Sequence, residues 1–232
     1  MGEIRMKNTK NENGRSMIEM LGVLAIIGVL SVGGIAGYSK AMHRYRVNKT
    51  IDQITYMAGA IRTFFAPQKS YSGLTARCRP NQPCLAKKAK LVPDEMWVEG
   101  KDFPQSVWGD WMEIYDDCRN QAECDNGIGK AFNIAYYNIP EEACIDLLTQ
   151  DWSNAGVEVI NVQNAENAEA ALQDQELWVI PPVSVDKAIR LCGCASDDPD
   201  GVDIIFFNFD VDVNDSYWKD QIDATTTLLN GN

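Results

Sequence analysis

The sequence predicts an α+β protein in which one long N-terminal helix is followed by a region of short strands. Two observations lead to this class. A run of twenty uncharged residues, 20–39, leads directly into an amphipathic stripe that continues to Phe65, as in a helix. Beyond it, short runs rich in aromatic and β-branched residues are bounded by Asn, Asp, Gly and Pro, as strands are.

The first element is a helix long and apolar enough to span a membrane, preceded by a polar leader that ends at Gly14. One carboxylate, Glu19, stands at the start of this helix. A charge at that depth costs about 2.5–3.5 kcal/mol even on the gentler insertion scales. We therefore expect Glu19 to have a positive partner, and its position suggests one on another subunit. Arg15, four residues earlier, is the alternative partner within the same chain.

The helix continues beyond the apolar run as an amphipathic segment. Its apolar residues recur at alternating spacings of three and four, which places them on one helix face. Pro67 ends the helix. We expect the first half to lie in lipid or in a filament core, and the second half to lie under a globular head. The stripe consists of Val47, Ile51, Ile54, Ala58, Ile61 and Phe65.

The remaining elements are predicted from composition and from the residues that bound them. The segment Gln68–Gln105 is rich in Pro, Gly and polar residues and is expected to be a connecting loop. Helices are expected at Pro140–Leu148, with Pro first and acids in the first turn, and at Val185–Leu191. The expected strands are Trp111–Tyr115, Phe132–Tyr137, Gly156–Val162, Leu177–Ile180 and Asp203–Phe209.

Length and charge limit the classes of function. The chain has 232 residues and a net charge of −12. About 165 residues remain after the whole N-terminal helix, which is enough for one domain with its own core. The acidic balance argues against nucleic acid and anionic membrane surfaces as partners. No Gly-x-Ser-x-Gly turn, phosphate-binding loop or histidine base occurs in the strand region, so an enzyme is not expected.

The seven cysteines favour an oxidising compartment. Cys78 and Cys84 are separated by five residues, as are Cys118 and Cys124, a spacing that suits short disulfide loops. A zinc site is the alternative. It lacks Cys-x-x-Cys pairs, and the single histidine, His43, lies next to the apolar run.

An acidic cluster near the C-terminus is the one candidate for a metal site. Asp198, Asp200 and Asp203 alternate around a Gly turn, as the ligands of calcium loops do. The full loop signature with a terminal glutamate is absent. A solvated acidic turn is therefore the preferred interpretation, with calcium as the alternative and no other cofactor expected.

The N-terminal motif resembles a known signal. Gly14, the small polar Ser16, the apolar Met17 and Ile18, and Glu19 before a long apolar helix are similar to the processing signal of type IV pilins and pseudopilins. The resemblance implies cleavage between Gly14 and Arg15 by a membrane peptidase, which methylates the new terminus at Arg15. It also implies that Glu19 pairs with the amino terminus of a neighbouring subunit. Arg15 departs from the pattern, because an apolar residue is usual there.

The resemblance extends into the head. The segment 107–114 is similar to the Trp-Gly turn before the first head strand of type IVb pilins, and segments 139–147 and 188–192 resemble those that carry its paired cysteines. This implies a bridge from Cys144 to Cys192 or Cys194. It also implies a pilin fold, with the helix packed on an antiparallel sheet. The expected regions are a leader (1–14), a transmembrane or filament-core helix (15–40), an amphipathic half-helix (41–66) and a disulfide-braced head (67–232).

The resemblance implies a structural role. We expect a subunit of a type IVb-like pilus that sits in the bacterial inner membrane as a prepilin and then joins an extracellular filament. Its expected partners are copies of itself, the prepilin peptidase and methylase, and the pilus assembly platform. A minor pilin or a type II secretion pseudopilin is one alternative. A membrane-anchored binding protein that does not polymerise is another.

Overall fold

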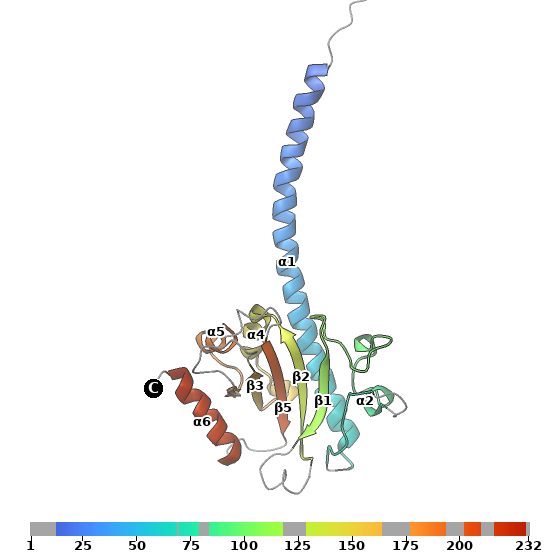
Figure 1. Cartoon of the computed structure of the whole chain (residues 1–232), viewed down its shortest axis with the longest axis vertical. Coiled ribbons are helices and arrows are strands. Elements are labelled where there is room, and N and C mark those ends of the chain that lie inside the picture. The colour runs from blue at the N-terminus through green and yellow to red at the C-terminus, as the bar shows by residue number, and fades with distance from the viewer. Residues whose placement is uncertain are drawn as a thin grey trace, which may run out of the picture. The chain divides into compact units, whose positions relative to one another are not determined.

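A computed structural model describes residues 13–68, 70–78, 84–117, 129–163, 177–193, 202–209 and 216–230. The chain forms two compact units, Met1–Tyr45 and Arg46–Asn232. Helix α1, Asn13–Phe65, supplies the described part of the first unit and continues into the second (Figure 1). It ends two residues before Pro67, which has no backbone N–H to extend it.

The second unit, here called the head, is built on one antiparallel sheet with the order β1-β2-β5-β3-β4. The predicted α+β class is confirmed, as is the packing of the helix on an antiparallel sheet. Strand β5 lies between β2 and β3, and its apolar run Ile204–Phe207 suits a central strand that is covered on both faces. The strands are β1 Met112–Asp117, β2 Ala131–Ile139, β3 Val159–Gln163, β4 Leu177–Val179 and β5 Val202–Phe209.

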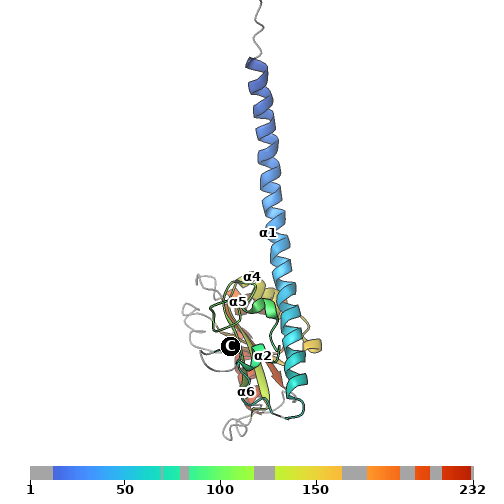
Figure 2. The ribbon, with the colours of Figure 1, turned by 90° about the vertical axis from the view of Figure 1, so that its right-hand side faces the viewer.

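The two faces of the sheet bury different sets of side chains, because neighbouring residues of a strand point to opposite faces. On one face, Phe132, Ile134 and Phe206 join the main core, to which α1 contributes Ile54 and Ile61. This core also includes residues of α4, Glu141–Leu148, and α5, Val185–Gly193. Figure 2 shows the end of α1 lying along this side of the sheet.

The opposite face has a smaller core that includes Trp178, Ile205 and Phe207. Helix α6, Ser216–Asn230, packs Ile222 against it. The backbone N–H of Trp178, in edge strand β4, donates to Thr225 Oγ1 of α6 at 2.9 Å. The helix thereby covers a strand edge that would otherwise present an unpaired donor.

Helix α6 is absent from the sequence prediction, and the segment Gln68–Gln105 is wrongly predicted as a plain loop. Three consecutive threonines lower the helix propensity of α6, so the local sequence does not predict a helix there. Contacts with β4 provide the stabilisation that the local propensity lacks. The supposed loop contains α2, Leu85–Lys88, and a 3-10 turn, Asp94–Met96. It buries Leu91 and Met96 in the main core, so it is part of the packed structure.

Candidate assembly site

The first unit exposes a continuous apolar helix surface. An 18-residue stretch of α1 has a mean hydropathy of 2.2 and none of it is buried, so α1 is long and apolar enough to cross a membrane. Between Met17 and Ile35, the exposed fractions of the large apolar side chains run from 52 % at Ile27 to 75 % at Ile18 and Val29. An apolar surface of this extent marks a contact with lipid or with other protein.

Glu19 is the single acidic residue between Met17 and Lys40, and it lies on the exposed surface of α1. Gly14 and Arg15 fall within the same helix, so Arg15 precedes Glu19 by about one helical turn. The two candidate partners of Glu19, Arg15 and the amino group that cleavage would free, are thus both close to Glu19 in the sequence. Cleavage between Gly14 and Arg15 stays a prediction.

In the head, Arg62 fixes the C-terminal half of α1. Its Nη1 donates to the carbonyl of Ala155 at 2.9 Å, and its Nη2 donates to that of Gly156 at 2.7 Å. Gly156 has φ +62° and ends the 3-10 turn Ser153–Ala155. A Cβ on Gly156 would overlap the Arg62 guanidinium. The glycine is therefore required twice, by its left-handed backbone and by the close approach of the arginine.

Further polar contacts hold the middle of α1. Thr50, fully buried, accepts a hydrogen bond from Trp108 Nε1 at 3.0 Å. Lys49 forms an ion pair with Glu95 of the 3-10 turn. The hydrogen bond from Lys49 holds the pKa of the Glu95 carboxyl below its usual range. These contacts fix the part of α1 from Lys49 to Arg62 within the head.

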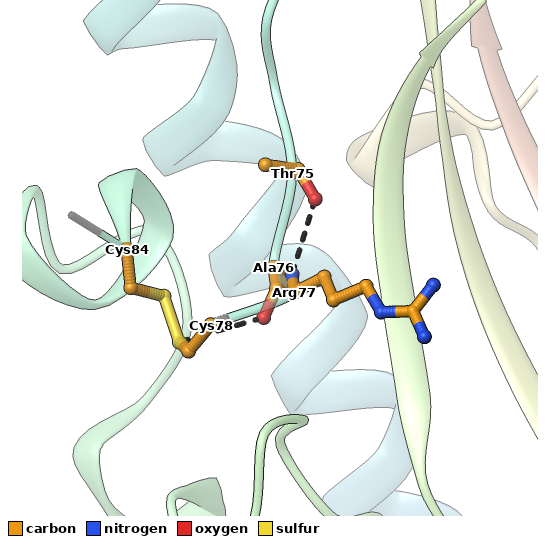
Figure 3. The surroundings of a disulfide bond; sticks show 5 residues. All are labelled: Thr75, Ala76, Arg77, Cys78 and Cys84. Atoms are coloured by element: carbon orange, nitrogen blue, oxygen red, sulfur yellow. Dashed lines mark hydrogen bonds between the residues drawn. A yellow bond between two sulfur atoms is a disulfide. The ribbon is translucent and has the colours of Figure 1, made fainter. Parts of the chain in front are cut away.

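Two disulfide bonds between described cysteines brace the head. Cys144–Cys192 joins α4 to α5 with both side chains fully buried, and Cys78–Cys84 closes a short loop (Figure 3). Between Cys192 and Cys194, the two partners that the sequence allows for Cys144, the structure selects Cys192. Bonded cysteines cannot be zinc thiolates, which removes these four from the zinc alternative. Cys118, Cys124 and Cys194 lie outside the described residues.

The acidic cluster lies mostly outside the described residues. Asp198 and Asp200 are not among them, while Asp203 begins β5 with Val202 and accepts a hydrogen bond from the backbone N–H of Asn138. Within the described part of the chain, no group of three or more His, Cys, Asp or Glu side chains is placed to hold a metal ion.

Sequence reasoning missed the contact between Arg62 and Gly156. Arg62 lies in the helical stripe region as one of many charged residues, and the sequence pattern places Gly156 at the start of a strand. Strand β3 instead begins at Val159, because Gly156 turns the chain with a positive φ. The Asn154-Ala155-Gly156 sequence is a turn signal that could have indicated this boundary.

Comparison with known proteins gives a family match. A family model described as PilS N terminal matches residues 44–177, more than half of the chain. Among solved structures, the chain is similar to the type IV b pilin from Salmonella typhi, with 16 % identity and a TM-score of 0.44 over 69 % of this chain and 99 % of that one. It is also similar to TcpA, a type IV pilin from Vibrio cholerae El Tor biotype, with 14 % identity and a TM-score of 0.38 over the same shares. No curated protein sequence matches it.

Proposed function

The chain belongs to the type IV pilin family, and on this premise we propose that it is the structural subunit of a type IVb-like pilus. In this proposal a prepilin peptidase removes residues 1–14 and methylates Arg15. The mature subunit waits in the inner membrane until the assembly platform adds it to an extracellular homopolymer. Its role is mechanical, and the chemistry is performed on the protein by the peptidase.

The observation that carries the proposal is the exposed apolar surface of α1 with one carboxylate at its start. Burying one Val, Leu or Ile side chain contributes about 1.5–3 kcal/mol, so the surface strongly favours lipid or other helices over water. A plain lipid anchor would explain the apolar residues but would gain nothing from Glu19, which raises the cost of insertion. A bundle of such helices explains both, because a neighbour's amino terminus can neutralise the carboxylate.

Processing can be tested by mass spectrometry of the membrane and filament fractions. We expect Arg15 at the amino terminus of the mature chain, carrying a methyl group. Gly14→Val should block cleavage because a bulky side chain would stand at the cut. Gly22→Val is the matched control: apart from the backbone of its own helix, no atom lies within 4 Å of a Cβ there, and cleavage should proceed. An intact Met1 terminus in assembled protein would contradict the proposal.

Assembly can be tested with Glu19→Ala and Glu19→Leu. Both should insert into the membrane normally, since a buried charge is removed. Both should lower the sheared filament fraction by about 100-fold or more, because an unpaired buried amino terminus costs about 3–5 kcal/mol. Asp52→Ala removes an exposed carboxylate from the same helix, outside the apolar run, and should assemble normally.

The outcomes separate the alternatives. Normal filaments from both Glu19 variants would mean that Glu19 and Arg15 neutralise each other within one chain. A processed wild-type chain that forms no filaments would indicate a minor pilin or a pseudopilin. A chain that is neither cleaved nor polymerised would indicate a membrane-anchored binding protein.

A further inference from the structure

The head carries a pocket of about 510 Å³ beside strand β1. Its volume lies within the range of small-molecule binding sites. The lining includes two aromatic side chains, two cations and carboxylates, among them Phe103, Trp111, Arg77, Lys101, Asp102 and Glu113. None of these residues belongs to the apolar surface of α1 or to the contacts that hold the helix, so the proposed function does not use them.

The aromatic wall of the pocket is fixed in place. Trp111 stacks on Tyr137 with ring centroids 4.1 Å apart and an interplanar angle of 10°, and Phe103 meets Trp111 edge-on at 4.9 Å. Trp111 nevertheless remains 36 % exposed. A large aromatic side chain that is rigid and still accessible gives a ligand contact area at little entropic cost.

The polar groups of the pocket have unused hydrogen-bonding capacity. Within the described residues, the side chains of Lys101 and Asp102 form no hydrogen bond or ion pair, and the Arg77 guanidinium lies 4.9 Å from the Phe103 ring centroid without a polar partner. Glu113 accepts one bond, from the Tyr137 hydroxyl, and a carboxylate can accept several. Donors and acceptors are thus both present around the aromatic wall.

Backbone contacts organise the pocket before any ligand arrives. The N–H of Cys78 donates to the carbonyl of Asp102 at 2.7 Å, and Gln105 pairs with Trp111 in a β-bridge. The Cys78–Cys84 disulfide anchors the segment that carries Arg77. Figure 3 shows the Arg77 side chain extending away from this disulfide, with its backbone N–H bonded to Thr75 Oγ1 at 3.1 Å.

We propose that this pocket binds a neutral saccharide. Each hydroxyl of a sugar both donates and accepts, so it can use Arg77 and Lys101 as donors and Asp102 and Glu113 as acceptors. The C–H face of the ring packs on the aromatic wall. An anion would meet the three carboxylates of Asp102, Asp110 and Glu113, and a cation would meet Arg77 and Lys101. An apolar ligand would cover all five charged side chains without offering any of them a polar partner. Binding at this site would give the subunit an adhesive function in addition to its structural one.

The test is a titration of the detergent-solubilised full-length chain with glucose, galactose, mannose, N-acetylglucosamine and lactose. Saturation-transfer difference NMR and calorimetry, taken to about 10 mM sugar, detect millimolar affinity. Trp111→Ala and Asp102→Asn should each weaken binding about tenfold, because the first removes the stacking surface and the second replaces a charged acceptor by a neutral amide. Glu99→Gln is the matched control: it removes an exposed charge three residues from Asp102 and outside the pocket, and binding should be unchanged.

Asp102→Asn is not expected to disturb folding, because within the described structure the Asp102 side chain forms no hydrogen bond or ion pair that the substitution could break. Urea unfolding checks that each variant is folded. Sulfate and sialic acid serve as anionic probes. The proposal is overturned if none of the neutral sugars binds, if binding survives both pocket variants, or if only the anionic probes bind and lose affinity in Arg77→Ala. None of these results bears on filament assembly, which is measured separately.

Discussion

Replacing Gly156 with alanine should destabilise the head through two separable effects. The first is backbone strain, since φ is +62° at this residue and a left-handed conformation costs an L-residue about 1–2 kcal/mol. The second is displacement of Arg62, whose guanidinium occupies the space of the new Cβ. The end of an arginine side chain can move, but here it would give up its bonds to two carbonyls.

The magnitude follows from these two terms. Arg62 is half-buried, so water can replace part of the two hydrogen bonds that its guanidinium loses. We therefore count the loss of one hydrogen bond from a charged donor, about 1.5–3 kcal/mol. The total loss in the free energy of unfolding is then about 2.5–5 kcal/mol. Gly73→Ala is the matched control: Gly73 has φ +85° and open space around its Cβ, so strain of about 1–2 kcal/mol is its whole cost.

The assay is urea unfolding of the detergent-solubilised chain followed by tryptophan fluorescence. All six tryptophans lie at or beyond Trp97, so the signal reports on the head and not on the apolar helix. A double-mutant cycle with Arg62→Ala isolates the contact: without the arginine, Gly156→Ala should cost no more than Gly73→Ala. Equal losses for Gly156→Ala and Gly73→Ala in the native background would refute the reasoning.

Three further predictions use the same unfolding assay. Replacing Cys144 and Cys192 by alanine should cost about 4 kcal/mol, and replacing Cys78 and Cys84 about 2 kcal/mol, because the bridged residues are 48 and 6 apart and the longer loop loses more chain entropy; equal losses would contradict this. Lys49→Ala should cost under about 1 kcal/mol at neutral pH, since Glu95 is exposed and water screens the pair. Because folding lowers the pKa of Glu95, the ion pair stabilises the head at pH values above the pKa of Glu95 in the unfolded chain, near 4.3. This stabilisation is lost as the pH falls through the pKa of Glu95 in the folded chain. If the cost of Lys49→Ala did not change with pH, or if Lys88→Ala cost as much, the cost would not come from the ion pair with Glu95. Asn161→Val should raise stability by about 1 kcal/mol or more, because both polar atoms of its fully buried side chain lack hydrogen-bond partners; a loss of stability would show that the amide is satisfied in solution.

Local patterns determined much of this protein. The spacing of apolar residues in α1 predicted its buried stripe, and Ile54, Ala58 and Ile61 are fully buried as expected. Aromatic and β-branched runs predicted the five strands of the described sheet, because the two-residue periodicity of a strand depends only on residues that are adjacent in the sequence. The motif from Gly14 to Glu19 pointed to the pilin family by itself, since it depends only on the order of neighbouring residues.

Tertiary structure decided what depends on residues far apart in the chain. Helix α6 forms where β4 offers an unpaired edge and an apolar face, and no local pattern encodes that surface. Arg62 and Gly156 lie 94 positions apart, and only the packing of α1 on the sheet brings the guanidinium to the carbonyl. Tertiary packing also selects Cys192 rather than Cys194 as the partner of Cys144. It likewise brings Arg77, Phe103 and Trp111 together around one pocket. The sequence of each segment determines its local conformational preferences. Contacts between residues far apart in the chain form only when folding closes the long loops between them.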